Sequence, residues 1–243
     1  MTRVAVQEEK VAFESLVGAG ERYEQRLIDL IRSRSAQDVC DVGGGAHPLL
    51  KPESLSIKYA VLDISEVELA KAPAEYTKIV ADISARDFQC ARQFDVVFTK
   101  FLAEHVRDGE QFHRNVYSML KPGGFAMHLF PTLYALPFLA NRLLPENLGR
   151  LALKLFFPGR VYGDEGKFPA YYRWCCGPTA AQIARLEGIG FRVLRYTGYF
   201  GHPYYKRVPG LRALERAKSD WLLRHPIPIL ASYASLFLQK PGV

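Results

Sequence analysis

The sequence has no run of about 18 uninterrupted apolar residues, so it predicts no membrane-spanning helix. Cysteine is scarce, with four in 243 residues, and none of the four has a zinc-binding spacing. This scarcity favours a reduced, cytoplasmic setting over a disulfide framework. Residues 1–16 carry acids and no apolar core, which argues against a secretory signal. Internal repeats and low-complexity segments are missing as well.

Hydrophobic residues make up 49% of the sequence, which is enough for a full core in a single domain over residues 1–243. Lysine and arginine exceed aspartate and glutamate by 32 − 25 = 7. That excess is compatible with an anionic substrate, a nucleic acid or a membrane surface, and a solvated surface explains it equally well. Charge therefore does not choose a partner, and the sequence makes no prediction of oligomeric state.

Apolar periodicity divides the chain into alternating strands and helices. Helices are expected over residues 8–34, with a glycine break, and over residues 108–124 and 177–191. The seven expected strands are residues 37–42, 58–65, 75–84, 93–100, 125–131, 191–200 and 229–241. Such alternation predicts an α/β fold, a Rossmann-like doubly wound, mostly parallel seven-stranded sheet with helices on both faces. Prolines interrupt the pattern over residues 131–176, which we expect to form a lid-like insert after the fifth strand.

Three glycines, Gly43–Gly45, directly follow the first expected strand. Glycine loses more backbone entropy on folding than any other residue, so the run suggests that something approaches the main chain closely. Acids stand at strand ends that should meet at one edge of the sheet, namely Asp41, Asp63 and Asp82. A dinucleotide fingerprint needs a glycine where Pro48 stands, which weakens that interpretation. A tight turn without a ligand is the simpler alternative.

Taken in order, these motifs resemble those of class I S-adenosylmethionine-dependent methyltransferases. The D-V-G-G-G loop is similar to their first motif, VLDIS to their second strand, ADI to the adenine motif and LKPGGF to the start of their fifth strand. The resemblance covers residues 35–130, and residues 177–243 more loosely, and it implies S-adenosylmethionine as the cofactor. It implies that Asp63 holds the ribose hydroxyls and that Asp82 lies beside the adenine. His47 stands where many members carry a third glycine. The implied cofactor-binding residues are Asp41, Gly43, Gly44, Gly45, Asp63, Ile64, Asp82, Ile83 and Lys100.

Methyl transfer is a displacement at an activated carbon, so the protein must align the acceptor and often removes its proton. The base should follow the fourth or fifth expected strand, where Glu104, His105 and His128 stand. Histidine titrates near neutral pH, so we rank His105 first and His128 second. The alternatives are a loop hydrogen bond for His105 and a core position for His128. The same three side chains could ligate a metal, but Lys100 stands where metal-dependent relatives carry a carboxylate, so we predict no metal.

Aromatic side chains gather in the insert and again at residues 199–205. We expect Tyr171, Tyr172 and Trp174 to line the site of a small-molecule acceptor, since aromatic rings give flat apolar walls with polar tips. A hydroxyl oxygen of a sugar, lipid or natural product is the favoured acceptor. Ordinary core packing is the alternative, and residues 129–144 could touch a lipid surface. An RNA methyltransferase is a second hypothesis, although no base-flipping motif supports it, and a nicotinamide-dependent oxidoreductase is a third.

Overall fold

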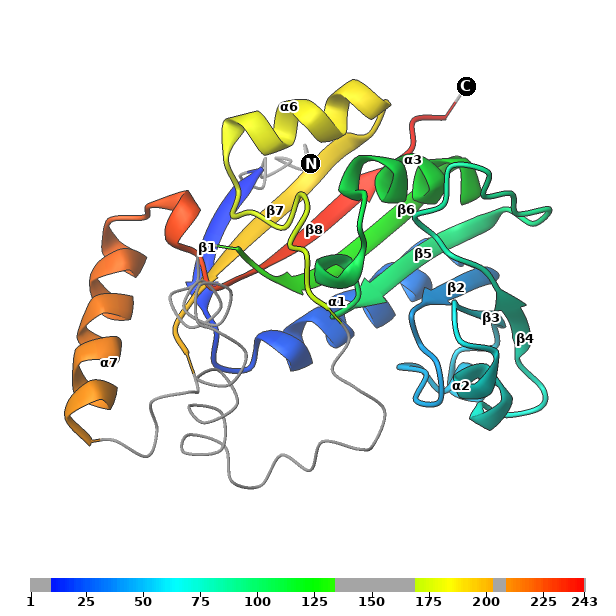
Figure 1. Cartoon of the computed structure of the whole chain (residues 1–243), viewed down its shortest axis with the longest axis horizontal. Coiled ribbons are helices and arrows are strands. Elements are labelled where there is room, and N and C mark those ends of the chain that lie inside the picture. The colour runs from blue at the N-terminus through cyan, green and yellow to red at the C-terminus, as the bar shows by residue number, and fades with distance from the viewer. Residues whose placement is uncertain (1–9, 134–168, 203–208, 243) are drawn as a thin grey trace, which may run out of the picture.

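One eight-stranded sheet forms the centre of the protein, which is seen here in a computed structural model that describes residues 10–133, 169–202 and 209–242 (Figure 1). The strand order is β1-β7-β8-β6-β5-β2-β3-β4. The strands are β1 (Val11–Ser15), β2 (Asp38–Val42), β3 (Lys58–Asp63), β4 (Thr77–Val80), β5 (Phe94–Lys100), β6 (Leu120–Pro131), β7 (Arg192–Phe200) and β8 (Tyr233–Gln239). Strand β8 is antiparallel to both of its neighbours, and each of the other described pairs is parallel. The predicted mostly parallel, Rossmann-like sheet is confirmed.

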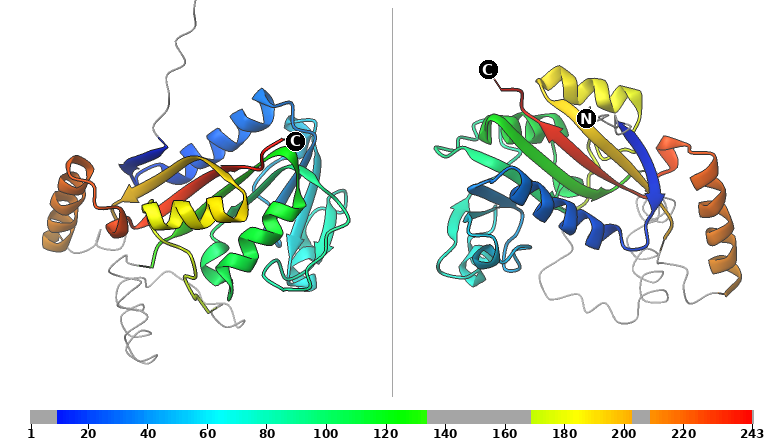
Figure 2. Two further views of the ribbon diagram at one scale, coloured as in Figure 1. Left: turned by 90° about the horizontal axis from the view of Figure 1, so that it is seen from above. Right: turned by 180° about the vertical axis from the view of Figure 1, so that it is seen from behind.

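Helices cover both faces of this sheet (Figure 2). They are α1 (Ala19–Ser33), α2 (Glu66–Lys71), α3 (Gly109–Met119), α6 (Ala180–Ile189) and α7 (Pro209–Arg224). Helix α1 packs on one face, where Tyr23 and Leu27 share a core with Met127 of β6. Helices α3 and α6 pack on the other face, against a core that holds Ala126 and Phe130 of the same strand. Neighbouring residues of β6 thus enter opposite cores, as the pleat of a strand requires.

Strand β2 stands where the strand order reverses. It pairs with β3 on one side and with β5 on the other. Ligands of parallel sheets bind beyond the carboxyl ends of the strands at such a switch point. The glycine loop follows Val42, the last residue of β2. The fold therefore puts Gly43–Gly45 where a ligand site is expected.

Two parts of the fold differ from the prediction. Residues 11–15 form β1 instead of helix, because Val11–Ser15 pair in parallel with Tyr196–Phe200 of β7, and the sheet gains an eighth strand at this edge. No helix is expected between the strands at 191–200 and 229–241, yet Pro209–Arg224 form α7. Most of the predicted insert, residues 134–168, lies outside the described residues. Among the described helices, none is long and apolar enough to cross a membrane.

Candidate active site

The glycine loop is held tightly by the protein itself. The backbone N–H of Gly43 donates to the Leu62 carbonyl at 2.7 Å, and Gly43 has a φ of 83°, which lies in the left-handed region. A Cβ on Gly44 would lie 2.9 Å from Val61 Cγ1 and 2.9 Å from Asp41 Cγ. Gly43 and Gly44 are therefore required by backbone conformation and by internal packing, whether or not a ligand is bound.

Asp41 ties this loop to the neighbouring strand. Its Oδ2 accepts one hydrogen bond from the backbone N–H of Leu49 and another from the Tyr59 hydroxyl, both at 2.8 Å. Burial raises the pKa of the Asp41 carboxyl to about 6, although these two hydrogen bonds lower it. The Asp41 carboxylate is thus hydrogen-bonded to the protein itself, and these bonds help to fix the conformation of the glycine loop.

Asp63 lies beside Gly45, the buried last glycine of the loop. Asp63 ends β3, and its Oδ1 accepts a hydrogen bond from the backbone N–H of Ser65 at 2.9 Å. A Cβ on Gly45 would lie 3.2 Å from Asp63 Oδ2, so any side chain there would crowd this carboxylate oxygen. The next residue, Ile64, keeps 62% of its surface exposed. An acid, bare backbone and an exposed apolar side chain therefore adjoin one another at the edge of the sheet.

The acid after β4 lies in a turn. Asp82 Oδ1 accepts hydrogen bonds from the backbone N–H of Ser84 at 2.8 Å and from the Ser84 hydroxyl at 2.7 Å. Its neighbour Ile83 points into the core that lies under α3. Of the two isoleucines expected beside an adenine, only Ile64 is exposed at this edge.

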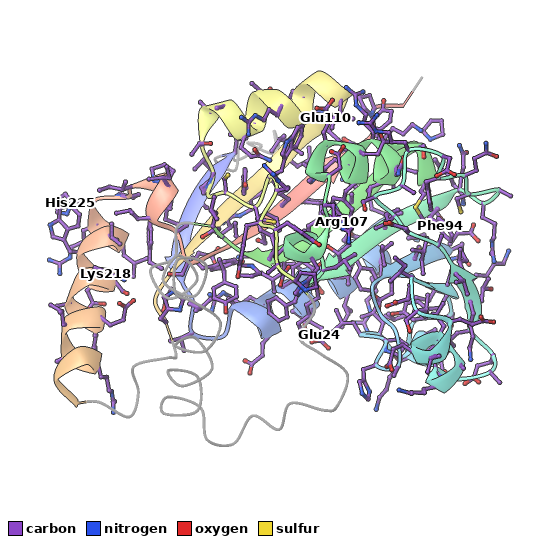
Figure 3. The ribbon with its side chains drawn as sticks, viewed as in Figure 1. Glu24, Phe94, Arg107, Glu110, Lys218 and His225 are labelled. Carbon is purple, nitrogen blue, oxygen red and sulfur yellow. The ribbon has the colours of Figure 1, made fainter. Side chains whose placement is uncertain are left out.

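The loop after β5 begins with Lys100 and leads into a short 3-10 helix, Ala103–His105. Lys100 Nζ lies 3.8 Å from Glu24 Oε2 of α1, and Figure 3 shows Glu24 below the tip of β5. Phe101 has a φ of 61°, and its ring meets that of Tyr233 edge-on with the centroids 6.1 Å apart. Lys100 is thus paired with an acid of α1.

Glu104 and His105 connect this loop to residues 169–172. The main-chain carbonyl of Glu104 accepts hydrogen bonds from the N–H groups of Tyr171 at 2.7 Å and Tyr172 at 3.0 Å. His105 Nδ1 lies 3.0 Å from the Pro169 carbonyl oxygen. A carbonyl can only accept, so Nδ1 carries the proton, and the lone pair of the neutral ring is on Nε2. The structure therefore assigns a tautomer to His105.

The Glu104 carboxyl is buried. Its Oε2 has no hydrogen-bond partner among the described residues, and its Oε1 lies 3.8 Å from His105 Nε2. Burial raises the pKa of Glu104 to about 8, because the charged form loses its hydration. At neutral pH this side chain is mostly a protonated, uncharged acid.

Backbone strain gathers around the same turn. Five non-glycine residues in the described ranges have positive φ. Phe101 precedes the Glu104 turn, Tyr172 donates a hydrogen bond to it, and Trp174 follows Tyr172 by two residues. Each left-handed residue that carries a side chain costs about 1–2 kcal/mol. Such strain persists where the surrounding structure enforces it, and it is concentrated at functional sites.

His128, the second candidate base, lies in the core beside a histidine that the sequence reasoning did not single out. His128 Nδ1 is 2.9 Å from Thr99 Oγ1, and the ring centroid is 5.5 Å from that of His113. Burial lowers the pKa of His113 to about 4 and that of His128 well below its usual value. Both rings are therefore neutral at physiological pH. In the described part of the chain, no group of three or more His, Cys, Asp or Glu side chains could hold a metal ion.

The three predicted acceptor aromatics are placed differently from one another. Tyr172 is buried, and the Trp174 ring stacks on His113 at 5.7 Å. Tyr171 is less buried, and its hydroxyl accepts a hydrogen bond from Arg107 Nε at 3.1 Å. Tyr171 and Trp174 are therefore half-buried, whereas Tyr172 is enclosed by the protein. Phe168, Tyr204 and Tyr205 lie outside the described residues.

Comparison with known proteins agrees with this geometry. Residues 40–128 match a family model described as a methyltransferase domain. The N-methyltransferase NodS from Bradyrhizobium japonicum WM9, solved with S-adenosyl-L-homocysteine, is similar at a TM-score of 0.51 and 14% identity, over 92% of this chain and 87% of that one. An S-adenosylmethionine-dependent methyltransferase from Clostridium acetobutylicum ATCC 824 is similar at a TM-score of 0.53 and 13% identity, over 93% and 95% of the two chains.

The [4+2]-cyclase SpnF also has this fold, with a TM-score of 0.51 and 18% identity over 90% of this chain and 82% of that one. No curated protein matches the sequence. At these identities the solved structures establish the fold, whereas the reaction has to be argued from the site.

Proposed function

We propose that this chain is a class I S-adenosylmethionine-dependent methyltransferase and that it methylates a hydroxyl oxygen of a small-molecule acceptor with His105 as the general base. The observation that carries the proposal is the hydrogen bond from His105 Nδ1 to the Pro169 carbonyl. It puts the proton on Nδ1, so Nε2 carries the lone pair of the neutral ring. A histidine in this tautomer suits the removal of a hydroxyl proton near neutral pH.

In this proposal the cofactor binds at the switch point of the sheet, beyond the carboxyl end of β2. The Asp63 carboxylate would accept hydrogen bonds from the two ribose hydroxyls, since charge-assisted bonds of this kind are short and strong. Gly45 fits this assignment because a Cβ there would crowd Asp63 Oδ2. Asp82 and Ile64 would meet the adenine, one at its edge and the other at its face. When bound, the cofactor supplies a methyl group already activated on a sulfonium.

Glu104 is proposed to act as a positioning residue in this scheme. Its main-chain carbonyl holds Tyr171 and Tyr172 next to the His105 turn. Its buried side chain is mostly uncharged below about pH 8, so it does not compete with His105 for a proton at neutral pH. The aromatic segment and the base would therefore be presented to the acceptor together.

Amine acceptors are the main competing possibility, because NodS is an N-methyltransferase. The likeness to SpnF, a [4+2]-cyclase, supports a further alternative, in which this fold carries out a reaction other than methyl transfer. The test incubates the protein with S-adenosylmethionine and matched pairs of hydroxyl and amino acceptors, and measures S-adenosylhomocysteine release and acceptor mass. A mass gain confined to hydroxyl compounds, and lost in His105→Ala, is the expected result. Methylation of the amino member alone, or of RNA alone, would overturn the proposal.

A further inference from the structure

Exposed apolar side chains are concentrated in and just after α7. Ten large hydrophobic side chains in the described ranges are exposed, and five of them lie between residues 214 and 230. We call these five the α7 patch: Leu214, Trp221, Ile227, Ile229 and Leu230. Single exposed apolar residues are ordinary on a protein surface, but a concentration of this kind marks a contact surface.

The inner side of α7 is already used to attach the helix to the body. Leu222 is buried in a small core with Phe200 and Ala231. Leu214 and Trp221 are seven residues apart, about two helical turns, so they share one side of the helix. The Trp221 ring, 49% exposed, stacks on His225 with the centroids 5.0 Å apart, and Figure 3 shows His225 on the outer side of α7, away from the sheet. The patch therefore includes the outward side of α7.

Positive charge accompanies the patch. Residues 209–230 contain four Lys or Arg and two Asp or Glu, a net charge of 4 − 2 = +2. One lysine is neutralised locally, since Lys218 Nζ pairs with Glu215 Oε2 at 2.7 Å. Arg212, Arg216 and Arg224 are exposed. Arg224, three residues after Trp221, lies near the tryptophan on the same side of the helix, whereas Arg212 and Arg216 lie on the opposite side from Leu214. A helix that combines an exposed tryptophan and leucine with several arginines has the composition of helices that lie in the interface of an anionic bilayer.

The position of α7 relates this surface to the active site. Strand β7 is antiparallel to β8, which is antiparallel to β6, so β7 and β6 point the same way. The carboxyl end of β7 therefore lies at the sheet edge that carries the glycine loop. Helix α7 comes next along the chain, at the β1 end of this edge (Figure 1).

We propose that the α7 patch docks on the surface of an anionic lipid bilayer, with Leu214 and Trp221 inserted among the headgroups and Arg224 against a lipid phosphate. The proposal does not depend on which atom is methylated. It places the carboxyl edge of the sheet near the membrane, from which an acceptor anchored in lipid could be reached.

The test is co-sedimentation of the full chain with vesicles of phosphatidylcholine, alone or mixed with phosphatidylglycerol. Binding is expected only to the anionic vesicles, and it should weaken as salt rises. Leu214→Ser with Trp221→Ser should lower vesicle affinity by about 100-fold or more. Arg224→Gln should lower it by about 5-fold. The matched control is Val67→Ser with Val80→Ser, which removes two exposed apolar side chains outside the patch and should leave binding unchanged.

Tryptophan fluorescence reports on the same contact, because the chain has only two tryptophans. Anionic vesicles should shift the emission to the blue, and Trp221→Phe should abolish the shift. Circular dichroism and S-adenosylhomocysteine binding verify that each variant is folded.

Three results would overturn the proposal. The first is no binding to either type of vesicle. The second is a dimer in light scattering that the Leu214→Ser, Trp221→Ser variant dissociates, because the patch would then contact a second copy. The third is tight binding of single-stranded RNA, lost in the arginine variant, without vesicle binding.

Discussion

The packing behind the glycine loop gives a prediction for Gly44→Ala. The added methyl would lie 2.9 Å from both Val61 Cγ1 and Asp41 Cγ, which is closer than side chains tolerate. Overpacking of this kind costs about 1–3 kcal/mol. Displacing the Asp41 carboxylate would also strain its hydrogen bonds to Leu49 and Tyr59, each worth about 1 kcal/mol or more. We expect a loss of about 2–4 kcal/mol in the free energy of unfolding.

In a protein of this size, a loss of about 2–4 kcal/mol corresponds to a Tm lowered by roughly 4–16 °C. Differential scanning calorimetry measures the Tm, and titration calorimetry with S-adenosylhomocysteine measures the effect on the loop, where weaker binding is expected. The control is Gly188→Ala in α6, where a Cβ meets nothing within 4 Å. It should keep ligand affinity and leave stability unchanged or slightly higher. If Gly44→Ala keeps both its Tm and its ligand affinity, the tight packing assigned to this loop is wrong.

Three further predictions concern the groups around the site. His105→Ala should lower turnover about 100-fold or more, while S-adenosylhomocysteine affinity stays unchanged; equal turnover in the variant would remove this histidine from the mechanism. Burial raises the Glu104 pKa from an ordinary 4.5 to about 8, so between these values the folded chain keeps a proton that the unfolded chain has released, and stability should fall as pH rises through that window. Glu104→Gln should flatten this slope in unfolding titrations at pH 5, 6.5 and 8, and an unchanged slope would show that another group causes it. Tyr59→Phe removes a donor to buried Asp41 and should cost about 1–3 kcal/mol in urea unfolding, whereas Tyr76→Phe, which keeps the ring beside Tyr59, should cost less.

The strands at the centre of the sheet could be predicted because each carries its own signal. Residues 38–42 and 94–100 are short segments in which most side chains are apolar, rich in valine and phenylalanine, as strands are. Strand β1 lacks such a signal: it lies at an edge, is mostly half-buried, and is fixed by pairing with β7, which is distant in sequence. Pairing with a distant strand overrode the local helical spacing.

The sequence predicts where the residues of the candidate site lie along the sheet, but it does not predict which side chains they contact. The acids at the ends of β3 and β4 follow from strand order, and so does the place of the glycine loop. The burial of His128 could not be predicted in this way. Strand alternation puts His128 on one face of the sheet, but it does not say that α3 covers that face. The same holds for Asp41, whose partners Leu49 and Tyr59 come from a loop and a neighbouring strand.

Helix α7 shows what composition alone leaves open. Its mixture of charged and apolar residues is compatible with a solvated surface, a nucleic acid or a membrane surface, and the sequence does not choose among them. The structure adds that Leu222 faces the body while Trp221, the adjacent residue, faces outward. The direction of each side chain decides between a solvated surface and a docking surface, and only the fold supplies it.

The most direct test of the account is titration calorimetry of S-adenosylhomocysteine into the wild-type chain and into Asp63→Ala. Asp63 ends β3 beside Gly45, and a carboxylate that accepts ribose hydroxyls contributes about 1.5–3 kcal/mol. We predict that the wild type binds the ligand and that Asp63→Ala binds it about 10- to 100-fold more weakly while its Tm without ligand changes little. A wild type that does not bind, or a variant that binds equally well, would contradict the placement of the cofactor at this edge of the sheet.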